Sequence, residues 1–492
     1  MTIASIQFFL FVLVATYIYH SLALKHRAKY LLFISYLFYL SWDIKYAALM
    51  SLVTIFVYFT ALKIKTAQSD KDNGKLVKLA VGILVLLLAF YKSYHFIQGS
   101  LSQLSHLVGL NFLSFPSKII LPLGLSYYIF KSINYLVDIY LNKIDPETNF
   151  INLANYISFF PQSVCGPIQK AQDFLPQIKN LSEVSPDLLV SGFRLILFGA
   201  FKKLVVADRL FEEIDTLFVY TNSANGAHAY WLIAYFYTIQ LYADFSAATD
   251  ISIGVARLFG IQSPKNFNNP FYAPNIQEFW RRWHMTLTSW LSAYVFTPLW
   301  LRLRYFGKFG LCFAILTNML LIGMWHGTHL QFLYFGLIQG ALICVSTLTL
   351  EFRNKFFNRH KTLNALRKYI GPLITFHMVV VSFVFIQASS LPAALLIIKN
   401  FLICLRSLLL DLNLYEFIAK IFKVGLYKSH LARIFISLVL METVHLAQSN
   451  LALKQKYLSA PLFLRWAAYY FLIIFIVFLS NFIDRPFVYN LF

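Results

Sequence analysis

The stretch that decides the fold is residues 309–350, with the sequence FGLCFAILTNMLLIGMWHGTHLQFLYFGLIQGALICVSTLTL. It runs for 42 residues without an Asp, Glu, Lys or Arg. Because a helix needs about 20 apolar residues to cross the hydrocarbon core of a bilayer, this run is long enough for two crossings. The stretch therefore predicts a pair of transmembrane helices.

The composition of the whole chain extends this conclusion. Of its 492 residues, 59% are hydrophobic and 13% are charged, whereas an ordinary soluble domain is about one quarter charged. This excludes a soluble domain and an intrinsically disordered chain. The length accommodates about eleven to thirteen crossings. We therefore expect an all-α polytopic integral membrane protein that forms a single membrane domain over residues 1–492.

The charge is strongly asymmetric, with 42 basic against 21 acidic residues and a net charge of +21. Most of the cations flank apolar runs, which is the pattern of positive-inside anchoring. The basic clusters at 25–29 and 63–78 predict two cytoplasmic loops and an N-terminus on the opposite side. No basic patch interleaved with aromatic residues is present in the sequence, so we expect no nucleic-acid partner.

Further apolar runs complete the expected set of helices. The run 119–140 contains Lys131 and Asp138, which at membrane depth must face protein or a water-filled cavity. The segment 159–169, FFPQSVCGPIQ, has two prolines and a glycine and predicts a broken or re-entrant element. The remaining predicted spans are 1–24, 30–42, 46–62, 79–96, 188–206, 216–243, 369–398, 434–451 and 466–483.

The first candidate site is His326, which interrupts the uncharged run 309–350 near its centre. An ionisable residue inside a membrane span is a functional candidate by default, because its burial is costly. Gly323 and Gly327 on either side allow a backbone or an acyl chain to approach closely. The alternative is a packing histidine that is hydrogen-bonded to a neighbouring hydroxyl.

The second candidate site is residues 275–290, NIQEFWRRWHMTLTSW. In one continuous helix this segment would carry an aromatic stripe and a polar stripe. The alternative is a helix that lies at the lipid headgroups, where Trp and Arg are common, but this gives no reason for a histidine on the polar stripe. Glu278 is expected to pair with Arg282 at i+4. The polar stripe consists of Gln277, Arg281, His284 and Thr288, and the aromatic one of Trp280, Trp283, Leu287 and Trp290.

The third candidate is Asp250, in the mostly apolar stretch 242–257, YADFSAATDISIGVAR. A buried carboxylate needs a partner. An ion pair with Arg257 on the same helical face is therefore favoured over a role in chemistry. The HxxxD motif of soluble acyltransferases is absent at both His284 and His326, as are a P-loop, a GxSxG elbow and an HExxH zinc helix. We expect no bound metal.

Several motifs in order carry a family resemblance. Together they resemble the membrane-bound O-acyltransferase family, and within it the bacterial alginate O-acetyltransferase branch. Relatives usually carry Arg-Asp-Tyr where this chain has Ser292-Ala293-Tyr294, so no role of that pair is carried over. The motifs are LPLGLSYYIFKSINYLVDIY (121–140), FFPQSVCGPI (159–168), ADFSAATDISIG (243–254), NFNNPF (266–271), IQEFWRRWHMTLTSW (276–290), MWHG (324–327) and the C-terminal PFVYNLF (486–492).

The resemblance implies a ring of tilted helices around a tunnel open to both faces of the membrane, with re-entrant and interfacial helices. N-terminal helices would occupy residues 1–110, a catalytic core 119–350 and C-terminal helices 351–492. His326 corresponds to the signature histidine of the family, and His284 to the second polar position of the active site in the bacterial branch.

The implied function is O-acyl transfer, most simply O-acetyl transfer. The acyl group would pass from a cytoplasmic thioester, acetyl-CoA or an acyl carrier, across the bacterial inner membrane to a hydroxyl of a cell-envelope polysaccharide. The thioester is a substrate, no cofactor is bound, and a periplasmic acyltransferase or acceptor protein is the expected partner. Such transfer needs a base, close positioning and donors for the oxyanion. An imidazole at His326 suits the base, and Gln277, Arg281, Arg282, Trp283 and Asp250 are candidate donor-binding residues.

Two alternatives stay open at this point. Within the family, the chain could transfer D-alanine from a carrier-protein thioester to teichoic acid. Outside it, a transporter or flippase without chemistry would commonly show inverted-repeat halves with broken helices in corresponding positions, and none is apparent. The sequence leaves four acceptors open: alginate, another exopolysaccharide, peptidoglycan or a lipid-linked glycan.

Overall fold

The computed structural model describes residues 2–66, 70–107, 122–223, 226–411, 414–424, 426–480 and 487, and these residues form helices and no strand. Eight of the helices are long and apolar enough to cross a membrane. This confirms the all-α, multi-pass prediction. The eight are fewer than the eleven to thirteen that the length accommodates, because several apolar runs form shorter, buried helices instead. The predicted C-terminal motif 486–492 lies outside the described residues except for Phe487.

The chain divides into two compact units, each described here by itself. Unit 1 comprises Met1–Ile196 and Ser252–Lys265, and unit 2 comprises Leu197–Ile251 and Asn266–Phe492. The predicted division at residues 110 and 351 is drawn from sequence motifs and not from contacts. The single membrane domain over residues 1–492 stays a prediction.

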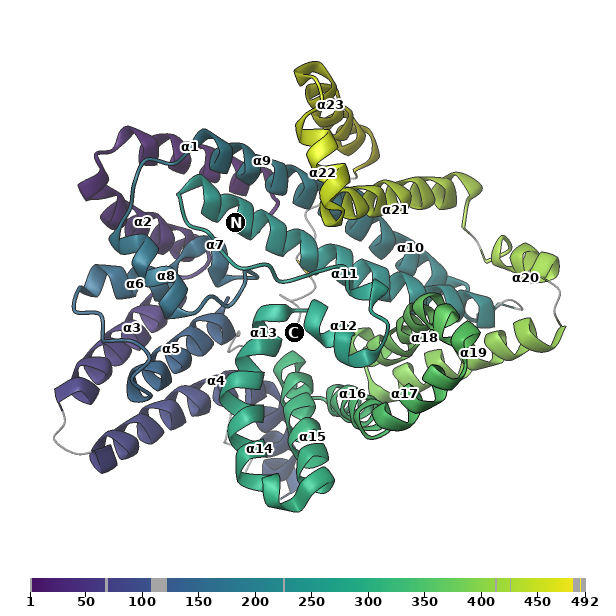
Figure 1. Cartoon of the computed structure of the whole chain (residues 1–492), viewed down its shortest axis with the longest axis horizontal. Coiled ribbons are helices and arrows are strands. Elements are labelled where there is room, and N and C mark those ends of the chain that lie inside the picture. The colour runs from purple at the N-terminus through teal and green to yellow at the C-terminus, as the bar shows by residue number, and fades with distance from the viewer. Residues whose placement is uncertain are drawn as a thin grey trace. The chain divides into compact units, whose positions relative to one another are not determined.

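Unit 1 is built on the N-terminal helices (Figure 1). The helix α5 is its core, because nearly all of its residues are buried and it packs against α3, α4, α6 and α8. The helices are α1 (Ile6–Ser21), α2 (Leu24–Leu40), α3 (Ile44–Thr66), α4 (Asp70–Leu107), α5 (Leu125–Tyr140), α6 (Phe150–Ser158), α7 (Phe160–Ser163), α8 (Ala171–Lys179) and the first part of α9 (Pro186–Phe201).

The polar residues of α5 face protein, as predicted. Lys131 is 1% exposed, and its Nζ donates to the Tyr156 carbonyl at 3.1 Å and to Gln162 Oε1 at 2.7 Å. Asp138 is equally buried and forms an ion pair with Lys143 at 3.1 Å. The segment 159–169 is broken into the single turn α7 and an irregular stretch, which confirms the prediction of a broken element.

Unit 2 contains the uncharged run 309–350 as two packed helices, which confirms the predicted pair. A side chain at Gly323 would collide with the Phe332 carbonyl, so the glycine is what lets α15 and α16 come together. The helices of unit 2 are α10 (Asp208–Val219), most of α11 (Gly226–Leu258), α12 (Ile276–Arg282), α13 (Met285–Leu291), α14 (Thr297–Leu303), α15 (Gly307–His326), α16 (Leu330–Leu348), α17 (Leu350–Arg359), α18 (Lys361–Gln387), α19 (Leu391–Asp411), α20 (Leu414–Ile421), α21 (Lys428–Ser449), α22 (Leu451–Leu458) and α23 (Leu462–Leu479).

The predicted spans 369–398 and 216–243 are wrong, because each is divided between two helices. The run 369–398 is split between α18 and α19, because the Ser390 side chain accepts a hydrogen bond from the Ala393 N–H and begins a new helix there. The run 216–243 is likewise divided, since α10 ends at Val219 and α11 begins at Gly226.

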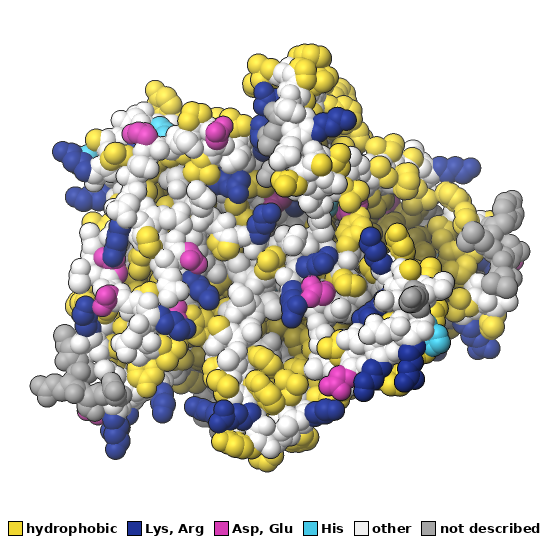
Figure 2. Space-filling model, viewed as in Figure 1, with side chains coloured by type: hydrophobic (Ala, Val, Ile, Leu, Met, Phe, Trp, Pro, Cys, Tyr) yellow, Lys and Arg dark blue, Asp and Glu magenta, His cyan; other side chains and the backbone are white. Residues whose placement is uncertain are grey.

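The last helix, α23, is the most lipid-like element of unit 2. Only 6% of the residues Leu462–Leu479 are buried inside the protein. Large side chains such as Phe463 and Phe478 are 70% and 78% exposed. Figure 2 shows hydrophobic side chains gathered over this helix. Apolar residues on all sides are expected of a helix whose solvent is lipid.

Two π-helical turns, η1 (Lys202–Ala207) and η3 (Ser292–Phe296), interrupt the α-helices of unit 2. π-Helical turns are rare in proteins, and those that occur often lie at functional sites. The first follows α9 and leads into α10, and the second follows α13 and leads into α14.

Candidate active site

The segment 275–290 is bent, so the prediction of one continuous helix there is wrong. The helix α12 ends at Arg282 and α13 begins at Met285. Between them His284 adopts the left-handed conformation with φ of 42°, which costs a residue other than glycine about 1–3 kcal/mol. The bend removes the predicted polar stripe and turns His284 away from Gln277 and Arg281.

The loop at residues 266–268 holds the bend together. The Met285 N–H donates to the Asn266 carbonyl at 2.8 Å, and the Asn268 N–H donates to the Arg282 carbonyl at 3.0 Å. These bonds satisfy backbone groups that the broken helix would otherwise leave without partners. At the start of α12, the Asn275 side chain accepts from the Glu278 N–H at 2.9 Å and caps the helix.

The bend buries His284, which is 1% exposed. Its Nδ1 lies 3.0 Å from Oδ1 of Asn266. The ring contacts Phe245, with the centroids 4.7 Å apart, and Trp325, at 5.4 Å. Burial, with the nearby His326 adding to it, holds the pKa of His284 well below its ordinary value, so the imidazole is neutral near pH 7.

His326 is the last residue of α15 and is 4% exposed. Its ring lies 4.9 Å from that of Trp325 and 5.8 Å from that of Phe335. Since Trp325 contacts both imidazoles, the structure brings His284 and His326 into one cluster, which we call the histidine pair. His329, three residues further on, is exposed and stands outside the cluster.

Trp280 links α12 to α16 and α18 through hydrogen bonds. Its indole Nε1 donates to Oε1 of Gln339 on α16 at 3.0 Å, and Gln339 Nε2 donates to Ser382 Oγ on α18 at 2.6 Å. Gln339 is fully buried. The short helix that leads into His284 is therefore held by a polar relay to two long helices.

The other predicted residues of segment 275–290 contact groups other than the two imidazoles. Arg281, whose side chain is 75% exposed, lies 2.7 Å from Glu278, and Arg282 lies 4.0 Å from the same carboxylate. The predicted pairing of Glu278 with Arg282 is thus present, but Arg281 is closer. Gln277 donates to Thr347 at 2.7 Å. Trp283 is buried against Phe383, at 4.9 Å between centroids.

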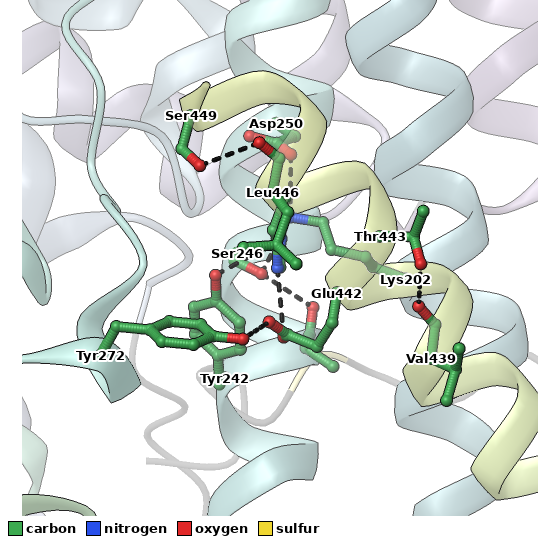
Figure 3. A network of polar contacts seen from close by, with 12 residues as sticks. Lys202, Tyr242, Ser246, Asp250, Tyr272, Val439, Glu442, Thr443, Leu446 and Ser449 are labelled. Carbon is green, nitrogen blue, oxygen red and sulfur yellow. Dashed lines mark hydrogen bonds and ion pairs between the residues drawn. The ribbon is translucent and has the colours of Figure 1, made fainter. Parts of the chain in front are cut away.

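Asp250 belongs to a different cluster (Figure 3), and its predicted pairing with Arg257 is wrong. Its Oδ2 lies 2.8 Å from Nζ of Lys202, which also donates to Ser246 Oγ at 2.9 Å. The π-helical turn η1 explains this partner, because it presents the buried Lys202 to α11. The Asp250 side chain is 23% exposed, so the ion pair sits at the edge of the protein interior.

Glu442 on α21 completes the view in Figure 3. Its Oε2 accepts from the Tyr272 hydroxyl at 2.7 Å, and its Oε1 lies 3.3 Å from Nδ1 of His445. Burial, together with the bond to Glu442, raises the pKa of Tyr272 to about 12. The phenol therefore stays protonated and acts as a donor.

Sequence patterns missed two residues of the histidine pair's surroundings, Asn266 and Trp325. Asn266 stands in the motif NFNNPF and Trp325 in MWHG, so the motifs contained both, but neither pattern shows that the side chain contacts His284. In the described part of the chain, no three His, Cys, Asp or Glu side chains come together as metal ligands. The chemistry that the site offers is proton transfer by two buried imidazoles.

Comparisons with known proteins identify the family of the chain. The model of the MBOAT, membrane-bound O-acyltransferase family, matches residues 32–390. The chain is 31% identical over 393 residues to "Probable alginate O-acetylase AlgI" of Pseudomonas putida, covering 80% of this chain and 78% of the relative. It is 32% identical over 405 residues to a peptidoglycan O-acetyltransferase of Helicobacter pylori, covering 75% and 73%.

A third relative carries a different acyl group in its name. The chain is 30% identical over 280 residues to a teichoic acid D-alanyltransferase of Bacillus subtilis, covering 54% of this chain and 69% of the relative. All three names describe transfer of an acyl group to a component of the cell envelope or its exopolysaccharide. With eight candidate spans and a family match over most of its length, this chain is a multi-pass acyltransferase that belongs to the membrane-bound O-acyltransferase family.

Proposed function

We propose that this protein is an O-acetyltransferase of the bacterial inner membrane that acetylates hydroxyl groups of a cell-envelope polysaccharide. The donor is a cytoplasmic thioester, either acetyl-CoA or an acyl carrier, and the acceptor is an exopolysaccharide or peptidoglycan. The observation that carries the proposal is the buried histidine pair, His284 and His326 around Trp325, in a chain of this family.

The reaction is a transfer of an acyl group from sulfur to oxygen. The acceptor oxygen bonds to the acyl carbon, and the bond from that carbon to sulfur breaks. A neutral imidazole takes up the hydroxyl proton and passes it to the departing thiolate, which leaves as a thiol. We assign the uptake to His326, and to His284 a role in orienting the donor or relaying the proton. The thioester is consumed as a substrate.

Arg281 and Arg282 are proposed to capture the donor. They are two neighbouring cations that share one carboxylate, Glu278, so the surface around them keeps a net positive charge. Such a surface attracts the phosphates of a CoA-like molecule. The donor-binding roles of Gln277, in α12, and Trp283, directly after α12, rest on their places beside this pair of arginines. That of Asp250 is less favoured, since the carboxylate is held by Lys202.

D-Alanyl transfer to teichoic acid is the second candidate, carried by the match to the Bacillus subtilis relative. That match covers 54% of this chain, whereas the two O-acetyltransferase matches cover 80% and 75%. The greater coverage favours acetyl transfer. A periplasmic acyltransferase or acceptor protein is the proposed partner in the delivery of the acyl group to the polysaccharide.

A comparison of donors tests this proposal. Membranes from cells that express the protein, or its His326→Ala variant, receive radiolabelled acetyl-CoA or a carrier protein loaded with radiolabelled D-alanine. We expect base-labile acetate on the envelope polysaccharide with the native protein and not with the variant. Label from D-alanine alone would support the second candidate, and label equal in both membranes would contradict the assignment to this site.

A further inference from the structure

The orientation of the Asn266 side chain can be read from its hydrogen bonds. Its Oδ1 position lies 3.2 Å from the backbone nitrogen of Thr286. A backbone N–H can only donate, so the atom that it faces is the carbonyl oxygen and not the amide nitrogen. The Thr286 hydroxyl, 2.9 Å from the same atom, donates in the same sense. The amide of Asn266 is therefore held with its oxygen toward the bend.

This orientation determines the tautomer of His284. Its Nδ1 lies 3.0 Å from the same oxygen and must carry the hydrogen, because the oxygen only accepts. In a neutral imidazole one ring nitrogen is a donor and the other an acceptor. The lone pair of His284 therefore lies on Nε2.

The Nε2 atom of His284 is buried and has no hydrogen-bond partner among the residues that the structure describes. A buried acceptor without a partner costs about 1–3 kcal/mol. The ring cannot easily turn to relieve this cost, because it is packed against Phe245 and Trp325 and is anchored by Asn266. Such an atom is suited to receive a proton from a bound substrate or from a relay.

From these contacts we propose that Asn266 is a positioning residue for acyl transfer, which holds His284 in the tautomer with hydrogen on Nδ1 and the lone pair on Nε2. The inference rests on the proposed function, because it names the proton-accepting atom of His284 in that reaction. Asn266 also forms the bend itself, through the bond from the Met285 N–H to its carbonyl. Asn266 thus determines both the position of the His284 side chain and the ring nitrogen that carries the hydrogen.

The amide matters because it carries no charge. A carboxylate at position 266 would also accept from Nδ1–H, but it would stabilise the imidazolium form and raise the pKa of His284. The group whose charge acts on His284 from a neighbouring element is His326 on α15. The other rings packed against His284, Phe245 on α11 and Trp325 on α15, carry no charge. Protonation of His284 at neutral pH would remove the acceptor.

The kinetic test compares Asn266→Asp and Asn266→Ala with the same changes at Asn268, whose side chain is exposed and whose backbone bond survives them. For Asn266→Asp we expect the acidic limb of the kcat profile to move up by about one to three pH units. Activity would be lost near pH 7 and recovered above it. Asn266→Ala should lower kcat about tenfold or more at every pH with little change in KM for acetyl-CoA. Native profiles in both variants would overturn the proposal.

A spectroscopic measurement tests the same point without any activity. The full-length protein, labelled with ¹⁵N-histidine in detergent micelles, is compared with its His284→Gln variant to assign the signals of His284. We expect a proton bonded to Nδ1 and an unprotonated Nε2 in the native protein. A proton on Nε2 would refute the role of Asn266 even if transfer is confirmed. The expected tautomer in a protein without acetyl transfer would instead refute the proposed function alone.

Discussion

Two regions of unit 2 bury ionisable side chains in opposite ways. Around η1, Lys202 pairs with Asp250, and Lys203 lies 2.8 Å from Asp244 and 2.9 Å from Asp208. In the histidine pair, the rings lie among aromatic side chains, and no carboxylate lies within ion-pair distance of His284 or His326 in the part of the chain that the structure describes.

This difference distinguishes ionisable residues that are buried for a structural role from those that are buried for a role in catalysis. A buried charge needs an opposite charge, and the lysines have theirs, so their polar atoms are already engaged. The neutral imidazole of His284 survives burial without an opposite charge and keeps Nε2 for a substrate. Burial of a titratable residue alone is therefore a poor sign of a site, and the lack of charge pairing is the better one.

The largest expected effect is on activity, at the histidine pair. His326→Ala should lower acyl transfer about 10²- to 10⁴-fold, the usual cost of losing a positioned base. Its unfolding temperature should stay close to that of the native protein if the loss is chemical and not structural. The matched control is His329→Ala, which is exposed and should keep most activity. Equal losses in the two variants would move the base away from His326.

The next largest effect is expected on stability, at the buried lysines of η1. Lys203→Met leaves Asp244 and Asp208 without their cation, and breaking a buried ion pair costs about 3–5 kcal/mol. We expect little monodisperse protein after detergent extraction. Adding Asp244→Asn should recover part of the yield, since it removes a charge that Lys203 no longer balances.

The stability of the Lys203→Met variant relative to the native protein is measured by thermal unfolding, with size-exclusion chromatography as the readout. The folded fraction of the Lys203→Met variant should retain acyl transfer per molecule. Normal stability with lost transfer would place Lys203 in the chemistry and would break the distinction between the two regions.

The smallest effect is expected at Arg281 and Arg282, whose side chains are 75% and 30% exposed. Replacing Arg281 or Arg282 with Gln removes attraction for donor phosphates but no buried contact, so KM for the thioester should rise several-fold with a smaller change in kcat. Initial rates at several salt concentrations measure this, because added salt screens the same attraction. If kcat collapsed while KM held, the arginines would belong to the transfer step.

The sequence predicted the most apolar membrane helices, because a span depends on the local hydrophobicity of about 20 residues. The run 309–350 folds as the predicted pair for this reason. His284 and His326 were found through family motifs, and the contacts that join them were not. The bend at His284 depends on bonds from a loop that precedes α12 in the chain, which no helical periodicity reveals.

The partner of Asp250 was missed for a related reason. On a helical wheel Arg257 lies on the same face, and the prediction used that proximity. The actual partner, Lys202, comes from another helix and is presented by the π-helical turn η1. Pairing across helices is set by tertiary packing, so a pattern within one helix could not find it.

The central claim is that His284 and His326 act as one unit. A double-mutant cycle tests it most directly, with acyl transfer measured for His284→Ala, His326→Ala and the double variant at equal amounts of folded protein. Residues that share one proton-transfer path lose function together, so we predict that the double variant is about as active as the worse single variant. Losses that multiply, so that the double variant falls by the product of the two single effects, would contradict the claim.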